Sequence, residues 1–201
     1  MDSNWDYWKK NAGLYDRNVV RQRDALYARL EDLIRTHLGK DMDVLELCSG
    51  SGNLASVFAP FVHSWIGVDY SDEMVKEARK MNIPNASFLT GDAQDISFTD
   101  ASFDAVVNIN ALQVIPSPGK CLEETKRVLK DGGILLCSTY IQDTHCTELD
   151  SSIPHNGEFM SYHNWSGEEF VSFVEDIGFR IVSSCILDEF SEKVCFVCAG
   201  K

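Results

Sequence analysis

The stretch VLELCSGSGNL, residues 44–54, decides how the rest of the chain is interpreted. An apolar run that contains Glu46 leads into Gly50 and Gly52, which are one residue apart. Two such glycines let the backbone bend tightly and approach a ligand that a Cβ atom would exclude. The stretch therefore predicts a strand, a glycine turn and the start of a helix, placed at the carboxyl edge of a parallel sheet, where open α/β folds bind ligands.

The length and composition predict one globular domain. The chain has 201 residues, of which 44% are hydrophobic and 24% charged. This is enough for one complete core and hardly enough for two. The N-terminus resembles no leader peptide, and no apolar run approaches the roughly 18 residues of a membrane span. We expect a single domain over residues 1–201 that is soluble, cytoplasmic and not bound to a membrane.

The charge and the cysteines narrow the range of partners. Eighteen Lys and Arg residues against 31 Asp and Glu residues give a formal net charge of −13, which would repel nucleic acid and favour a small or cationic ligand. The sequence has seven cysteines, and because it shows no secretion signal we expect these cysteines to be reduced. Cys195 and Cys198 have the spacing of a metal or redox motif, but in an apolar strand they would point to opposite faces. We expect packing cysteines and no metal.

The apolar periodicity predicts strands that alternate with helices. Strands of this kind, joined by helical crossovers, form a parallel sheet. The hairpin at the end of the chain predicts one antiparallel strand near the sheet's edge. The expected strands cover residues 43–48, 63–69, 86–90, 103–109, 134–140, 178–187 and 193–200, and the expected helices cover residues 19–38, 54–61, 71–81, 120–129 and 166–177, with a turn at 131–133.

Two segments fall outside this alternation. Residues 1–40 begin with aromatic side chains at roughly helical intervals, including Trp5 and Tyr15, and predict a helical cover over the domain. Residues 141–165 form a long polar and aromatic connection, a type that is usually functional or partly helical. We interpret this second segment as a lid that could close over a substrate.

Acidic residues recur where the first three strands end. Glu46, Asp69 and Asp92 would converge on one pocket, because the carboxyl ends of parallel strands share an edge. Asp69 follows Gly50 by 19 residues, close to the roughly 20-residue interval at which an acid can bind ribose hydroxyls. Ala55 occupies the third glycine position of the dinucleotide fingerprint, which tolerates alanine. A nucleotide-dependent oxidoreductase therefore remains an alternative.

Several motifs in order carry a more specific signal. They are residues 44–52, Asp69 within IGVDYS (66–71), Asp92 with Ala93, FDAVVN (103–108) and GGI (132–134). In this order the chain resembles the class I S-adenosylmethionine-dependent methyltransferases over almost its whole length. The resemblance implies S-adenosyl-L-methionine as cofactor. It also implies a Rossmann-like three-layer sandwich with a seven-stranded, mostly parallel sheet, an antiparallel C-terminal strand and an N-terminal helical cover.

The resemblance also implies roles for single residues. Asp69 would bind ribose, Tyr70 would pack against adenine, and Asp92 would accept a hydrogen bond from the adenine amino group. From the residues alone, Glu46 could equally hold the turn through backbone N–H groups, and Asp69 and Asp92 could be helix-capping carboxylates. Cys48 departs from the usual first glycine, and Gln113 stands where many relatives carry histidine. The implied cofactor-binding residues are Tyr15, Glu46, Cys48, Gly50, Gly52, Asp69, Tyr70, Met74, Asp92, Ala93, Asn108 and Gln113.

The expected reaction needs little from the protein beyond positioning. Methyl transfer is an in-line displacement at an already activated methyl group, and orientation can contribute about 7–11 kcal/mol. A general base is needed only where the acceptor must lose a proton. Tyr140, His145 and His163 are candidates for that role because the segment after the fifth strand opens at the ligand edge. Each of the two histidines could instead be an ordinary solvated loop residue.

The sequence thus predicts methyl transfer from S-adenosylmethionine to a small-molecule acceptor. Two other functions remain open: a non-catalytic protein of the same fold that binds an adenosyl ligand or a partner protein, since fold does not determine function, and the oxidoreductase. The accepting atom, the acceptor and the oligomeric state are not determined by these patterns.

Overall fold

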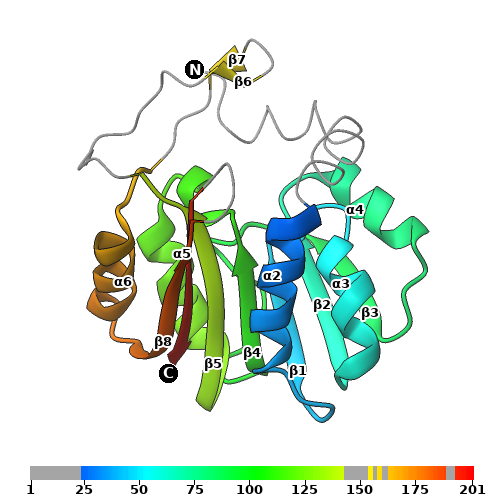
Figure 1. Cartoon of the computed structure of the whole chain (residues 1–201). Coiled ribbons are helices and arrows are strands. Elements are labelled where there is room, and N and C mark those ends of the chain that lie inside the picture. Colours follow the sequence, from blue (N-terminus) through cyan, green and yellow to red (C-terminus); the bar gives the residue numbers. More distant parts are fainter. Residues whose placement is uncertain (1–23, 143–153, 156–157, 160–162, 189–192) are drawn as a thin grey trace.

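The computed structural model describes residues 24–142, 154–155, 158–159, 163–188 and 193–201 (Figure 1). Tyr15 and His145 lie outside these residues, as does most of the expected lid. The described elements alternate between strand and helix, as expected. They are α2 (Asp24–Arg35), β1 (Asp43–Leu47), α3 (Asn53–Phe58), the 3₁₀ turn η2 (Ala59–Phe61), β2 (Ser64–Asp69), α4 (Asp72–Lys80), β3 (Ala86–Thr90), β4 (Phe103–Ile109), the 3₁₀ turn η3 (Leu112–Val114), α5 (Pro118–Val128), β5 (Leu129–Tyr140), β6 (Pro154–His155), β7 (Glu158–Phe159), α6 (Gly167–Asp176), β8 (Arg180–Leu187) and β9 (Val194–Gly200).

Seven strands form one sheet in the order β3-β2-β1-β4-β5-β9-β8. The first five strands pair in parallel, and β9 is antiparallel to both of its neighbours, β5 and β8. The chain winds outward from β1 through β2 to β3, and then returns to the other side of β1 with β4. This reversal creates a topological switch point between β1 and β4, where open α/β sheets bind ligands.

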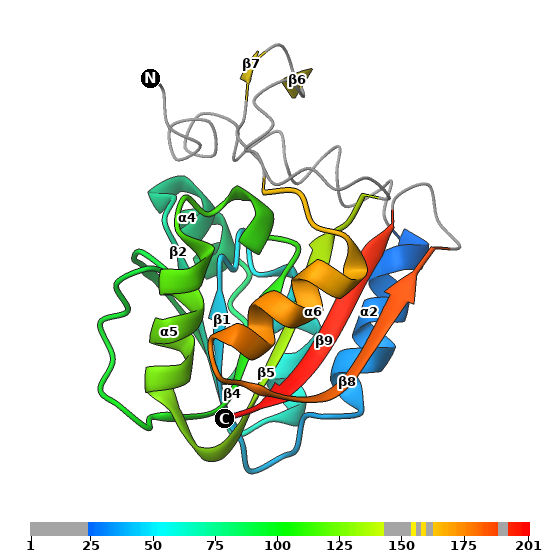
Figure 2. The ribbon, with the colours of Figure 1, turned by 90° about the vertical axis from the view of Figure 1, so that its left-hand side faces the viewer.

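Helices cover both faces of the sheet, which confirms the three-layer sandwich (Figures 1 and 2). Helices α2, α3 and α4 bury Leu30, Phe58 and Val75 against one face. Helices α5 and α6 bury Leu122 and Phe170 against the other. Because the parallel strands are covered twice, their sequences are nearly continuous apolar runs rather than alternating patterns.

Cys195 and Cys198 confirm the predicted geometry of strand β9. Both side chains are about 1% exposed, and they belong to the cores on opposite faces of the sheet. They therefore cannot share a metal ion. In the described part of the chain, no cluster of three or more His, Cys, Asp or Glu side chains is arranged to hold a metal, and no helix is long and apolar enough to cross a membrane.

The prediction of a turn at residues 131–133 is wrong. Helix α5 ends at Val128, and Leu129 is already extended and paired with Phe103, so that strand β5 runs from Leu129 to Tyr140 without a separate turn. Gly132 has a positive φ of 78°, and the register between β4 and β5 shifts here. The glycines thus form an irregularity inside a strand. The helix expected to reach residue 38 likewise ends earlier, at Arg35.

The capping box that begins helix α6 is confirmed. The Ser166 hydroxyl accepts a hydrogen bond from the Glu169 amide at 3.2 Å, and the Glu169 carboxylate accepts from the Ser166 amide at 2.7 Å. The rings of Trp165 and Phe170 pack 5.5 Å apart on either side of the cap as a hydrophobic staple.

We expect Ser166→Ala to lower the free energy of unfolding by about 1 kcal/mol, because the alanine variant leaves the amide of Glu169 without its acceptor. Ser172→Ala is the matched control, since Ser172 is exposed within the same helix and alanine is the better helix former there. Urea denaturation of the two variants measures the difference. Equal stability of both variants would contradict the assigned cap.

Candidate functional site

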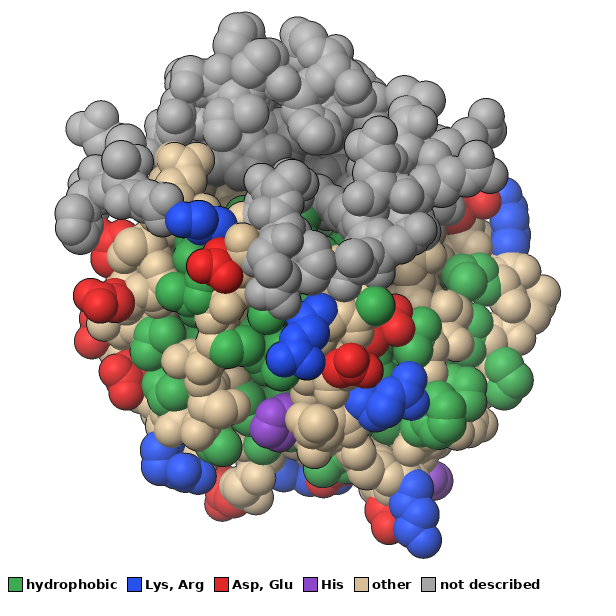
Figure 3. Space-filling model, viewed as in Figure 1, with side chains coloured by type: hydrophobic (Ala, Val, Ile, Leu, Met, Phe, Trp, Pro, Cys, Tyr) green, Lys and Arg blue, Asp and Glu red, His purple; other side chains and the backbone are tan. Residues whose placement is uncertain are grey.

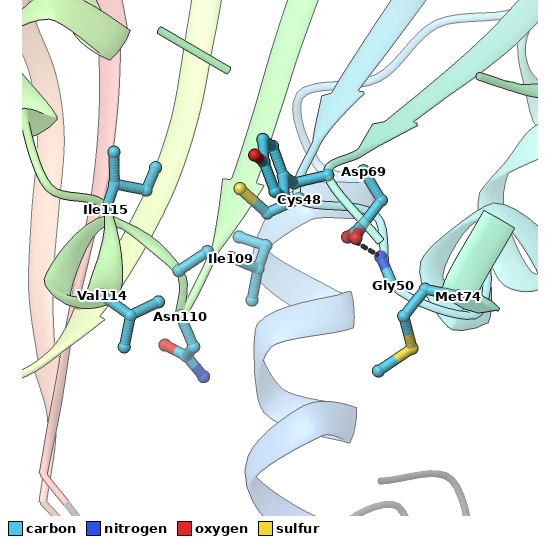
Figure 4. Close-up of a pocket in the computed structure, with 10 residues that line it drawn as sticks. Cys48, Gly50, Asp69, Met74, Ile109, Asn110, Val114 and Ile115 are labelled. Carbon is cyan, nitrogen blue, oxygen red and sulfur yellow. Dashed lines mark hydrogen bonds between the residues drawn. The ribbon is translucent and has the colours of Figure 1, made fainter. Parts of the chain in front are cut away.

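A pocket opens at the carboxyl edge of the sheet, at the switch point between β1 and β4 (Figure 4). Asp69, Gly50 and Met74 form one wall, and Asn110, Val114 and Ile115 lie across from them. Apolar side chains dominate the lining, and none of the described Lys or Arg residues contributes to it. The lining residues are Cys48, Gly50, Asp69, Tyr70, Met74, Ile109, Asn110, Ala111, Val114 and Ile115.

Asp69 organises the turn that follows β1. Its Oδ2 accepts a hydrogen bond from the Gly50 amide at 2.8 Å, and its Oδ1 accepts from the Ser71 amide at 2.9 Å. Burial raises the pKa of this carboxyl above its ordinary value, and the two amide bonds partly oppose the rise. A carboxylate has about four lone-pair sites, so Asp69 retains capacity to accept from a ligand.

The two glycines of the turn have different surroundings. Gly50 has a φ of 53° and lines the pocket, and a Cβ atom built on it would meet nothing within 4 Å. Gly52 has a φ of 87° and does not line the pocket. A Cβ atom there would lie 2.9 Å from Cζ of Phe88 and 3.2 Å from Cβ of Ala78. Gly50 therefore leaves room for a ligand, whereas Gly52 lets the turn pack against β3 and α4.

Cys48 faces the pocket from the end of β1 (Figure 4). Its φ of 58° is unusual for a residue with a side chain. Burial, followed by the nearby Asp69 carboxylate, raises the pKa of the Cys48 thiol well above its ordinary value. The sulfur thus remains a neutral thiol at physiological pH, and a thiol is a much weaker nucleophile than a thiolate.

Glu46 lies beneath the turn and does not line the pocket. It is 3% exposed, and its Oε2 accepts a hydrogen bond from Nε1 of Trp65 at 2.8 Å. The Gly50 amide is held by Asp69, so the turn-holding role suggested for Glu46 belongs to Asp69. Burial raises the pKa of Glu46 to about 8, while the bond from Trp65 opposes the rise and the charge of Asp69 adds to it.

The raised pKa of Glu46 predicts a pH-dependent stability. A carboxyl group whose folded-state pKa exceeds its unfolded value contributes stability below about pH 4.5 and loses it as the pH rises towards 8. The free energy of unfolding of the wild type, relative to Glu46→Gln, should therefore fall by a few kcal/mol between pH 5 and pH 8. Urea denaturation at these two pH values measures it, with the exposed Glu168→Gln as control. A pH-independent difference would contradict the prediction.

Four further predicted cofactor residues lie near the pocket but do not line it. Asp92 accepts a hydrogen bond from the Gln94 amide at 2.8 Å, and its neighbour Ala93 is buried. Gln113 is buried, donates to the carbonyl of Asn110 at 2.7 Å and accepts from Thr139 at 3.0 Å. Asn108 is 1% exposed, and neither polar atom of its side chain has a hydrogen-bond partner among the described residues. Their contacts with a cofactor stay predictions.

Two of the three catalytic candidates are described. Tyr140 ends strand β5 and is partly buried against the core on the α2 side. The backbone amide of His163 donates to the carbonyl of Gln113 at 2.7 Å, and its ring stacks on Trp165 with centroids 5.5 Å apart. Neither residue lines the pocket as described. Their roles in catalysis, like that of His145, stay predictions.

One wall of the pocket was not predicted from the sequence. This wall is the segment that directly follows strand β4, and it contributes Ile109, Asn110, Ala111, Val114 and Ile115. A usable signal existed, because the segment follows the FDAVVN motif and must begin at the same sheet edge as the glycine turn. The structure shows that the wall extends past the motif into η3.

Comparisons with known proteins show which proteins this chain resembles. Residues 45–137 match the protein family described as "Methyltransferase domain". Two similar relatives are the uncharacterized methyltransferase YcgJ of Bacillus subtilis, 33% identical over 151 residues, and a protein of Mycolicibacterium smegmatis named "Probable S-adenosylmethionine-dependent methyltransferase", 28% identical over 172 residues. The alignments cover 70% and 84% of this chain, and the chain spans 59% and 62% of the two relatives.

Solved structures show the same fold. A crystal structure of an S-adenosylmethionine-dependent methyltransferase from Methanosarcina mazei superposes with a TM-score of 0.70 at 24% identity. The superposition covers 84% of this chain and 96% of that chain. The strand order and the two helical layers described above are therefore those of a known architecture.

Proposed function

We propose that the chain is a class I S-adenosylmethionine-dependent methyltransferase and that it transfers the methyl group of S-adenosylmethionine to a small-molecule acceptor. The observation that carries the proposal is the partly buried Asp69 carboxylate, which accepts a hydrogen bond from the amide of Gly50 in a pocket at the topological switch point. This is the position at which an α/β sheet of this type presents an acid to a ribose.

The residues present fit the cofactor. The open side of Gly50 is a space that a Cβ atom would fill, and Asp69 retains lone pairs for ribose hydroxyls. Tyr70 and Met74 supply an aromatic and a thioether surface beside Asp69 for a planar base. The cofactor-binding residues proposed from the described part of the chain are accordingly Gly50, Asp69, Tyr70 and Met74, with Cys48 between the two walls.

S-Adenosylmethionine supplies an activated methyl group on a sulfonium sulfur. The chain therefore has to bind and orient the methyl donor and the acceptor, and to exclude water. The amides of Gly50 and Ser71 lock the Asp69 carboxylate, which limits the movement of a ribose held by it. Ile109, Val114 and Ile115 make the opposite wall apolar and exclude water from the pocket. Cys48 remains a thiol, and it can therefore line the pocket of an electrophilic methyl donor without consuming it.

Pocket composition and charge support a small acceptor. The lining formed by the described residues is mainly apolar and lacks Lys and Arg, which suits neither a phosphate backbone nor a strongly anionic substrate. The formal net charge of −13 opposes nucleic acid as well. Figure 3 shows the face of the molecule that is viewed in Figure 1. Among the described residues on this face, the basic side chains are scattered between acidic and apolar ones and do not gather in a patch.

Calorimetry with S-adenosylhomocysteine tests the proposal. We expect micromolar binding by the full-length protein, with NADH binding at least tenfold more weakly. A screen of small metabolites with isotopically labelled S-adenosylmethionine should then identify a methylated product by mass spectrometry. Failure of S-adenosylhomocysteine to bind, or stronger binding of NADH, would overturn the proposal, and binding without turnover of any acceptor would favour a non-catalytic binding protein.

A further inference from the structure

Asn110 occupies an unusual position in the wall of the pocket. It directly follows strand β4 and has a φ of 53°, a left-handed conformation that asparagine tolerates better than most residues. Its backbone amide donates to the carbonyl of Ser138 at 2.9 Å, and its carbonyl accepts from Nε2 of Gln113 at 2.7 Å. Thr139 in turn donates to Oε1 of Gln113. The backbone of Asn110 is thus held from two sides.

The orientation of the Asn110 side chain is also determined. The Ser138 hydroxyl accepts a hydrogen bond from the backbone amide of Asn110 at 3.2 Å and donates its one hydrogen to Oδ1 of the Asn110 side chain, 2.8 Å away. Oδ1 thus accepts the single hydrogen that the Ser138 hydroxyl can donate, and a flipped amide would take this acceptor away from the hydroxyl. The side chain therefore presents its NH₂ group away from Ser138.

That NH₂ group has no acceptor among the described residues. Nδ2 of Asn110 is buried and lacks a hydrogen-bond partner there, although Asn110 lines the pocket across from Asp69, Gly50 and Met74 (Figure 4). A buried donor without a partner costs about 1–3 kcal/mol. Four hydrogen bonds to the rest of Asn110 hold this donor in place in spite of that cost, which is the arrangement expected of a group that a bound molecule satisfies.

We propose that Asn110 positions the methyl acceptor by donating a hydrogen bond from Nδ2 to an oxygen of that molecule. This inference rests on the proposed function, because it assigns the Asp69 wall to the adenosyl group and the Asn110 wall to the second substrate. The acceptor is then a small, largely apolar molecule with an oxygen lone pair near the accepting atom. Ile109, Val114 and Ile115 surround its apolar part.

The type of oxygen follows from the rest of the wall. A neutral amide donor, with no Lys or Arg in the lining that the described residues form, suits a carbonyl or ether oxygen better than a phosphate or sulfate. Gln113 and Ser138 are positioning residues in this arrangement, because they act on the acceptor through Asn110. Gln113 thus has a role that its place outside the pocket lining would not suggest.

Two probes of the same shape test the inference. Acetophenone carries a carbonyl oxygen, and α-methylstyrene replaces that oxygen with a CH₂ group that cannot accept a hydrogen bond. Each is titrated by NMR into the full-length protein saturated with S-adenosylhomocysteine. We expect acetophenone to bind about tenfold more tightly and to shift the side-chain NH₂ resonances of Asn110, which are identified by their absence from the Asn110→Asp spectrum.

Two variants make the test specific. Asn110→Gly keeps the left-handed backbone and removes the donor, and Asn110→Asp keeps the shape and replaces the donor with an acceptor. Both should lose the preference for acetophenone and keep the affinity for S-adenosylhomocysteine within about twofold. Equal binding of the two probes by the wild type, including no binding of either, overturns the inference.

A loss of tenfold or more in S-adenosylhomocysteine affinity in Asn110→Gly would also overturn it, because the donor would then serve the cofactor. The proposed function fails separately, if S-adenosylhomocysteine does not bind to the wild type.

Discussion

Replacing Asp69 by alanine is expected to weaken the binding of S-adenosylhomocysteine at least 100-fold. In the wild type the carboxylate holds the Gly50 and Ser71 amides, and hydrogen bonds to a charged group contribute about 1.5–3 kcal/mol each. The variant loses both of these bonds together with the proposed ribose contact. The turn that forms one wall of the pocket then loses its fixed shape, in addition to losing a ligand contact.

Calorimetry measures the effect, and two variants separate its causes. Asp69→Asn should bind with intermediate affinity, because its single amide oxygen can accept from Gly50 or from Ser71 while the charge is lost. Asp131→Ala controls for the removal of a carboxylate, since Asp131 is fully exposed at the start of β5, at the other edge of the sheet. An affinity of Asp69→Ala within threefold of the wild type would contradict both the turn-holding role and the ribose site.

Replacing Gly52 by alanine is expected to lower the free energy of unfolding by about 3 kcal/mol or more, a larger loss than that of Ser166→Ala. The new Cβ atom would lie 2.9 Å from the ring of Phe88 and 3.2 Å from Cβ of Ala78, so the surrounding core would have to shift to admit it. The φ of 87° adds the cost of a left-handed conformation for a residue with a side chain. Urea denaturation measures the loss.

Gly50→Ala is the matched control, because it places the same methyl group in the same turn. Its φ is also positive, so part of the backbone cost is shared, but the Cβ atom meets no atom within 4 Å. This variant should lose only about 1 kcal/mol of stability and should bind S-adenosylhomocysteine at least tenfold more weakly, since the methyl group enters the pocket. If both variants lost stability equally, the assignment of different roles to the two glycines would be wrong.

Most of the fold could be predicted from the sequence because its signals are local. Strands β3 and β4 begin and end where the apolar runs predicted, and Ser71 and Ser166 cap the helices that follow them. Each of these features depends on residues within one or two turns of each other. The irregular entry into β5 was missed because Leu129 pairs with Phe103 on a different strand, and that pairing overrides the local turn signal of Gly132 and Gly133.

The site was predicted less completely, for the same reason. The motifs identified Gly50 and Asp69 as neighbours, and the structure joins them by a hydrogen bond. The motifs could not distinguish Gly50 from Gly52, because the difference depends on Phe88, which approaches from strand β3. Glu46 had two interpretations, and the partner that the structure shows is Trp65 on the neighbouring strand.

By itself, the sequence determined the order of the elements and the edge of the sheet at which the pocket opens, since periodicity, caps and short motifs are encoded in adjacent residues. The tertiary structure alone decided which side chains face the pocket. Within the described part of the chain, Oδ1 of Asn110 accepts a hydrogen bond from Ser138 on strand β5, 28 residues away, whereas its Nδ2 has no partner. Such contacts join distant parts of the chain, and their geometry arises only when the sheet and its helices pack together.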